Sequence, residues 1–133
     1  MYLLDTNVCI RLLNRNGSPA FIQKFSIRSP TDFRLCSVVK YELYYGAYKS
    51  SRKSQNLEKI EQFFDQFQSL VLDDESAKLA GKIRSQLTTQ GIPIGPNDVL
   101  IAAIALANNL TLITHNTREF SRVDGLQLED WEI

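Results

Sequence analysis

The stretch YLLDTNVCIRLL, residues 2–13, decides the fold. It begins with a short apolar run that ends at Leu4, turns polar at Asp5, and continues with apolar residues spaced as on one face of a helix. An apolar run, a polar cap and an amphipathic segment in this order predict a strand that leads directly into a helix.

Strand and helix signals alternate along the rest of the chain. Ser18 before Pro19 and the acidic run 73–75 mark helix starts, and Ser37 is expected to cap the helix after the second strand. Parallel neighbours need a crossover, usually a helix, so the alternation predicts a three-layer α/β/α fold with a small parallel sheet. Strands are expected at 33–36, 70–72, 110–114 and 126–133, and helices at 18–29, 37–47, 54–68, 73–91, 99–106 and 117–120.

Length and composition indicate one folded domain, residues 1–133. Hydrophobic residues make up 44% of the chain and charged residues 23%, as is usual in globular proteins. The apolar runs fall well short of the roughly 20 residues that cross a bilayer, and no signal-peptide pattern opens the chain. The two cysteines, Cys9 and Cys36, form neither a disulfide framework nor a zinc motif, so a cytoplasmic location without membrane attachment is expected.

The charges balance overall but are unevenly placed. Fifteen basic and fifteen acidic side chains give a net charge of zero, yet residues 1–53 carry nine basic and only three acidic ones. Charge alone favours a mixed, solvated surface over a nucleic-acid partner. If three acids were taken up by a metal ion, the remainder would be positive, and the cations available for phosphates would include Arg11, Arg15, Lys40, Lys49, Arg52 and Lys53.

Acidic residues follow the predicted strands at the edge where those strands end. Asp5 follows the first strand, Glu42 lies in the helix after the second, and Asp98 opens the apolar helix before the fourth. Taken singly, each has an ordinary role at a helix start or on a helix surface. Together at one sheet edge, near the reversal of strand order where ligands bind, they would repel one another unless a cation lay between them. Carboxylate oxygens are the ligands of Mg²⁺, so a Mg²⁺ site is predicted, with Mn²⁺ as an alternative.

Four stretches of the chain carry a resemblance to a known family: LLDTNV (3–8), SVVKYELYYGA (37–47), GPNDVLIAAIAL (95–106) and LITHNTREFSRVDGLQLEDW (112–131). They resemble the PIN-domain toxins of the VapC type, and most closely the tRNA(fMet)-specific endonucleases. The resemblance implies a PIN fold and a Mg²⁺-dependent endoribonuclease that cleaves tRNA, with initiator tRNA as the substrate of that subgroup. It also implies the toxin of a type II toxin-antitoxin (VapBC) system, blocked by a VapB-type antitoxin. With the acids described above, it implies hydrolysis of a phosphodiester by a metal-activated water.

The resemblance also implies roles for single residues. Asp5 and Asp98 would be the principal metal ligands and Glu42 the third acid. Asn116 stands where many PIN domains have a fourth acid, and an amide is no charged ligand, so a second ion would bind weakly or only with substrate. Hydrogen bonds that support Asp5 are expected from Thr6, Asn7 and Thr114.

Several further residues have more than one interpretation. The tyrosines at helical spacing in 41–48 favour core or interface packing over stacking on RNA bases, so a homodimer is expected. The single histidine, His115, is expected to be a loop side chain rather than a general base, because a metal ion makes a base unnecessary. Substrate phosphates are expected at Lys49, Arg52 and Lys53.

Two other functions remain open from the sequence. A phosphoryl-transfer domain of the receiver or haloacid-dehalogenase type also has acids at strand ends, but the second aspartate of the latter type is replaced here by Asn7, and no lysine follows the fourth strand. A non-enzymatic RNA-binding or antitoxin-docking module would fit the amide at Asn116. Titration with Mn²⁺ separates this module from an enzyme, because a decayed site would have lost its ion.

Overall fold

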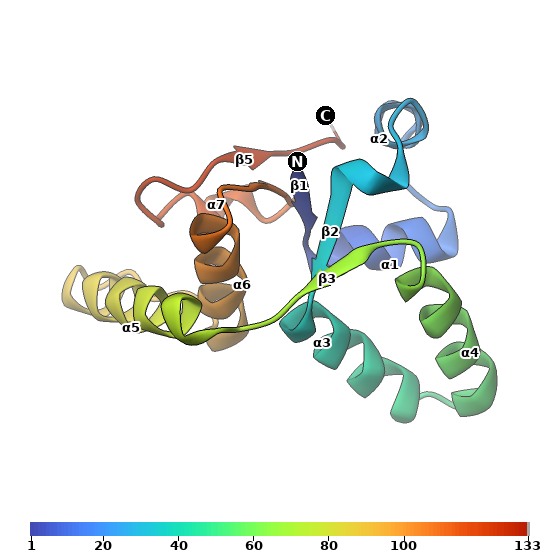
Figure 1. Ribbon diagram of the computed structural model, residues 1–133, viewed down its shortest axis with the longest axis horizontal. Coiled ribbons are helices and arrows are strands. Elements are labelled where there is room, and N and C mark those ends of the chain that lie inside the picture. The colour runs from blue at the N-terminus through green and yellow to red at the C-terminus, as the bar shows by residue number, and fades with distance from the viewer. Residues whose placement is uncertain (133) are drawn as a thin grey trace.

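Residues 1–132 are described by a computed structural model, in which short strands alternate with helices along the chain (Figure 1). The strands are β1 (Tyr2–Leu4), β2 (Phe33–Cys36), β3 (Gln68–Leu70), β4 (Thr111–Ile113) and β5 (Leu128–Glu129). The helices are α1 (Thr6–Asn14), α2 (Pro19–Ser26), α3 (Ser37–Tyr48), α4 (Lys53–Phe64), α5 (Asp74–Thr89), α6 (Pro96–Ala107) and α7 (Thr117–Phe120), with a 3₁₀ turn at Pro30–Asp32.

The structure confirms the predicted parallel sheet. All neighbouring strands are parallel, in the order β3-β2-β1-β4-β5. From β1 the chain first adds β2 and β3 on one side and then returns to add β4 and β5 on the other. The strand order therefore reverses between β1 and β4, and ligands of open parallel sheets bind at the carboxyl ends of the strands beside such a reversal.

The core lies where β1 and β4 meet α6. Leu3 and Leu112 are fully buried, and so is every residue of the run from Ile101 to Ala105 in α6. In Figure 1, α5 and α6 lie on one side of the strands, and α1 and α4 lie on the other. Because α6 is enclosed by α5, α3 and β4, it is apolar around its whole circumference, as its sequence predicts.

Two predicted boundaries in the middle of the chain are wrong. The helix expected at 54–68 ends at Phe64, and the strand expected at 70–72 lies at Gln68–Leu70. Phe67 is buried against Phe63 after the helix has ended, so it contributes to the core without being helical. Val71 is 64% exposed. An edge strand pairs through its backbone on one side only, so polar residues can form β3. The apolar run beyond β3 lies outside the sheet.

Of the three side-chain caps predicted at helix starts, the structure confirms two. Ser18 accepts a hydrogen bond from the backbone N–H of Phe21, and Asp73 accepts one from that of Ser76, as expected. Ser37 is wrong as a cap, because α3 already begins at Ser37 and is preceded by Cys36, which makes no side-chain cap. Across residues 1–132, no helix is both long and apolar enough to cross a membrane.

The turn between α1 and α2 gives a stability prediction. A Cβ at Gly17 would lie 2.1 Å from Cδ1 of Phe21, whose ring is buried. Gly17→Ala should therefore lower the free energy of unfolding by about 1–3 kcal/mol, as overpacking does, measured by urea denaturation. Gly81→Ala is the matched control: Gly81 lies inside α5 with nothing within 4 Å of the added Cβ, so this change should stabilise by about 0.5–1 kcal/mol. Equal stability of both variants would contradict the packing described.

Candidate active site

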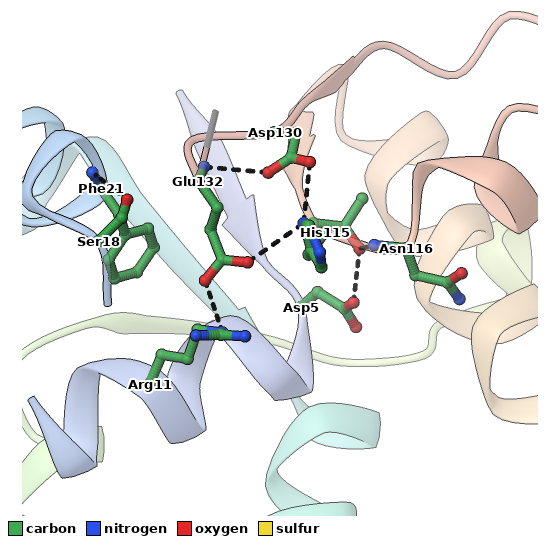
Figure 2. A network of polar contacts seen from close by, with 9 residues as sticks. Asp5, Arg11, Ser18, Phe21, His115, Asn116, Asp130 and Glu132 are labelled. Carbon is green, nitrogen blue, oxygen red and sulfur yellow. Dashed lines mark hydrogen bonds and ion pairs between the residues drawn. The ribbon is translucent and has the colours of Figure 1, made fainter. Parts of the chain in front are cut away.

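Asp5 lies at the strand reversal and is held from several sides. It follows β1, caps α1, and its backbone N–H donates to the carbonyl of Ile113 in β4 over 3.1 Å. Its Oδ1 accepts from the backbone N–H of Thr6 (2.8 Å), and its Oδ2 accepts from the hydroxyl of Thr114 (2.7 Å). The Thr114 oxygen in turn accepts from the backbone N–H of Asn116 (2.9 Å). Asp5 and Asn116 are labelled in Figure 2. The buried carboxylate of Asp5 is thus fixed by residues that follow both β1 and β4.

Glu42 joins Asp5 through Thr6. Glu42 lies in α3, and its Oε1 accepts a hydrogen bond of 2.7 Å from the Thr6 hydroxyl. Thr6 therefore donates its backbone N–H to one carboxylate and its hydroxyl to the other. The first turn of α1 brings together two acids that lie 37 residues apart in the sequence.

Asp98 completes the group from the first turn of α6. The pKa of Asp98 is raised to about 6, mainly by burial and then, in decreasing order, by the charges of Asp5, Glu42 and Glu119. Burial is also the main reason that the pKa of Asp5 is raised, although the hydrogen bonds from Thr114 and Thr6 oppose this effect. The acids of four elements therefore act on one another electrostatically, and holding them all ionised is costly.

These acids have no basic partner in the part of the chain that the structure describes. The ion pairs among residues 1–132 join Arg11 to Glu132 and His115 to Asp130 and Glu132, and none of them includes Asp5, Glu42 or Asp98. Unneutralised carboxylates at the carboxyl edge of a parallel sheet are suited to an external cation, since carboxylate oxygens are the ligands of Mg²⁺ and Mn²⁺.

The supporting residues lie only partly as expected. The hydrogen bonds from Thr6 and Thr114 to Asp5 are present, although Thr6 uses its backbone N–H and reserves its hydroxyl for Glu42. Asn7 is exposed on α1, and within residues 1–132 no hydrogen bond joins its side chain to Asp5. Asn116 reaches the site through its backbone N–H on Thr114.

Glu119 is the acid that sequence reasoning missed. It lies in the first turn of α7, three residues after Asn116, and its charge contributes to the raised pKa of Asp98. The available signal was its spacing, because residues three apart on a helix share one face and an acid near a helix start is favoured there. Glu119 thus adds a carboxylate in the first turn of the helix that Asn116 precedes.

The basic residues expected to bind phosphates lie away from the acids. Lys49 directly follows α3 and is seven residues beyond Glu42, which corresponds to about 10 Å along the helix axis. Arg52 and Lys53 line an open hollow at the connection to α4. His115 contacts the C-terminal tail rather than the acids: its Nδ1 lies 2.9 Å from Oδ2 of Asp130.

Comparison with known proteins agrees with this fold. The PIN domain family matches residues 2–126. A ribonuclease VapC2 of Rickettsia felis is 34% identical over 132 residues, covering 99% of this chain and 98% of the relative. A tRNA(fMet)-specific endonuclease VapC of Shigella flexneri is 40% identical over 132 residues, covering 98% and 97%.

Solved structures show the same fold. VapBC2 from Rickettsia felis, bound to a DNA fragment from its promoter, superposes with a TM-score of 0.88 at 34% identity and covers 98% of both chains. DNA-bound VapBC from Salmonella typhimurium gives a TM-score of 0.89 at 35% identity, covering 98% of this chain and 97% of that one. The protein is an α/β protein with a five-stranded parallel sheet and acids at its strand reversal. The chain belongs to the PIN-domain family. Its curated relatives of nearly equal length are VapC ribonucleases.

The raised pKa of Asp98 predicts a pH-dependent stability. In the folded, metal-free protein this carboxyl releases its proton near pH 6, against 3.8 ordinarily, so the folded state holds the proton more tightly and stability falls as pH rises through that window. In EDTA at pH 7.5, Asp98→Asn should therefore raise the free energy of unfolding by about 1 kcal/mol, a value reduced because the half-buried group is partly screened by water.

The control for this measurement is Asp124→Asn, a change at an exposed aspartate in the turn before β5, which should leave the free energy of unfolding nearly unchanged. The gain from Asp98→Asn should shrink at pH 4.5, where the wild-type carboxyl is already protonated in the folded state. An equal gain at both pH values would contradict a charge-based cause.

Proposed function

We propose that this chain is a Mg²⁺-dependent endoribonuclease that cleaves tRNA, with initiator tRNA as the first substrate to test, and that residues 1–133 form one PIN domain. The observation that carries the proposal is the group of Asp5, Glu42 and Asp98, whose charges have no basic partner within residues 1–132. The names of the relatives, ribonuclease VapC2 and tRNA(fMet)-specific endonuclease VapC, support RNA as the substrate class.

The donor set fits a hard divalent cation. Asp5, Glu42 and Asp98 offer carboxylate oxygens and would hold Mg²⁺, or Mn²⁺ in its place, and the charge of Glu119, a fourth acid, acts on Asp98. When bound, such an ion neutralises charge on the phosphodiester and supplies the acidity that activates a water for attack on phosphorus.

The residues of the chain orient this donor set. Thr114 and Thr6 hold Asp5 and Glu42 by hydrogen bonds, which orients these two carboxylates. In-line attack of water on phosphorus breaks the bond to the 3′ oxygen and leaves a 5′-phosphate and a 3′-hydroxyl. A non-enzymatic module, the alternative suggested by Asn116, is less well supported, because Glu119 adds a further carboxylate whose charge acts on Asp98.

The RNA strand is proposed to run along α3. Glu42 and Lys49 are two helical turns apart and share one side of the helix, so a strand that leaves the acids in this direction meets Lys49 and then Arg52 and Lys53. These cations would hold phosphates and add affinity rather than sequence selectivity.

The partner is proposed to be a VapB-type antitoxin. The solved relatives are VapBC complexes, which supports this assignment. A hollow of about 500 Å³ is lined by residues of α1, α2 and α4 and just beyond, among them Phe21, Phe25, Phe63 and Phe67, and an apolar surface of this kind favours a protein partner. The exposed tyrosines of α3 favour a homodimer, and tRNA as the substrate favours a cytoplasmic location.

Removing the central carboxylate should abolish cleavage. Asp5→Asn should reduce Mg²⁺-dependent cleavage of purified tRNA by about 100-fold or more, because the buried ligand at the strand reversal loses its charge. New 5′ ends are counted by sequencing. Asp124→Asn removes an exposed carboxylate elsewhere and should cleave like the wild type. Full activity of Asp5→Asn would overturn the proposed function.

The hydroxyl of Thr114 should strengthen the binding of the metal ion. Thr114→Val removes the hydrogen bond to Asp5 and should weaken the binding of Mn²⁺ by about 10- to 100-fold, measured by calorimetry on the apo protein. Thr114→Ser keeps the hydroxyl and should bind Mn²⁺ nearly as the wild type does. If both variants bound alike, Thr114 would have no part in orienting Asp5.

A further inference from the structure

We propose that the hollow beside the acidic site binds one unpaired nucleobase of the RNA, next to the cleaved phosphate. This inference rests on the proposed function and names a subsite for its substrate. The hollow measures about 460 Å³, within the size range of small-ligand sites. Its lining residues are Asn7, Ile10, Arg11, Asn16, His115 and Asn116.

The position of the hollow ties it to the acids. One wall is the face of α1 that carries Asn7, Ile10 and Arg11, at positions i, i+3 and i+4. His115 and Asn116, directly after β4, also line the hollow. Asn7 is two residues from Asp5, and the backbone N–H of Asn116 supports the threonine that holds Asp5. A nucleotide that places its phosphate at the acids therefore has its base within reach of this hollow.

The chemistry of the lining matches a base better than a phosphate. Three asparagine side chains offer paired donors and acceptors, the groups that read the edges of bases. Arg11 is the single guanidinium in the lining, and its charge is already balanced by an ion pair with Glu132. The hollow thus presents hydrogen-bonding groups and the apolar side chain of Ile10 rather than free positive charge.

His115 supplies an aromatic ring that is fixed in advance. Its Nδ1 lies 2.9 Å from Oδ2 of Asp130 and 3.2 Å from Oε2 of Glu132, and both carboxylates are about nine-tenths buried (Figure 2). The His115 side chain itself is 59% exposed. A ring held at one nitrogen and open to solvent is a stacking platform for an unpaired base, and its fixation lowers the entropy lost on binding.

The carboxylates behind His115 serve this fixation. The ligand atoms of His115, Asp130 and Glu132 lie within 4.8 Å of one another, a grouping that also occurs in metal sites. Unlike the acids around Asp5, however, which have no basic partner within residues 1–132, Glu132 pairs with Arg11, and both of these carboxylates contact His115. Their arrangement is explained by holding Arg11 and His115 in position in the lining of the hollow.

A binding experiment tests the hollow without requiring activity. His115 is the single histidine of the chain, so its ring protons give identifiable NMR signals. In EDTA, the wild-type protein is titrated with the four nucleoside 5′-monophosphates and with ribose 5-phosphate. We expect saturable shifts of the His115 ring signals with at least one base, no comparable shift with ribose 5-phosphate, and binding weakened at least about fivefold by Asn16→Ala. Equal shifts with ribose 5-phosphate, or none with any base, would overturn the inference.

A cleavage experiment separates this inference from the proposed function. Short RNAs carrying each of the four bases on either side of the cut are compared by kcat/KM. Asn16→Ala should reduce the ratio between the best and the worst base at one of these positions at least about fivefold, whereas Gln86→Ala, an exposed amide on α5, should keep it. If the wild type cleaves RNA and Asn16→Ala retains the full ratio, the base subsite is wrong. If the wild type cleaves no RNA, the proposed function fails and the NMR titration still decides on the hollow.

Discussion

Carboxylates that lie together without a countercharge are the constraint on which the rest of this structure depends. Asp5, Glu42, Asp98 and Glu119 come from four elements, and burial together with their mutual repulsion raises the pKa of Asp98 to about 6. Such a group disfavours the folded state, so packing elsewhere must hold it in place. The fully buried residues of β1, β4 and α6 provide that packing directly behind the acids.

Two threonines orient the carboxylates of Asp5 and Glu42 by hydrogen bonds. A hydroxyl donates one hydrogen bond and accepts others, so Thr114 accepts from the backbone of Asn116 while it donates to Asp5. Thr6 links Asp5 and Glu42 through its backbone and its hydroxyl. Because the contact from Asn116 to Thr114 is made by its backbone, the side chain at this position is free to be an amide without disturbing Asp5.

The parts of the site that sequence predicts are those that depend on local signals. Asp5 stands at a strand-to-helix boundary and Asp98 at the start of a wholly apolar helix, and both features are visible in a few neighbouring residues. Glu119 is not predicted from the sequence because its role depends on where the four-residue helix α7 lies in space. The predicted position of β3 is wrong because apolar residues indicate burial, whereas an edge strand needs only backbone pairing. Gln68 and Ser69 provide this pairing as well as Val71 would.

The carboxyl edge of the sheet carries a second acidic group, and its countercharges explain why the two groups differ. Strand β5 pairs in parallel with β4 and therefore delivers Asp130 to the same edge at which β1 delivers Asp5. Asp130 and Glu132 contact His115, and Arg11 neutralises Glu132, so this group ties α1 and the end of β4 to the C-terminal tail. Asp5 and its neighbours meet no such cation in residues 1–132. One fold thus uses carboxylates at one edge in two ways, and the presence or absence of a basic partner decides which group is structural and which is suited to an external ion.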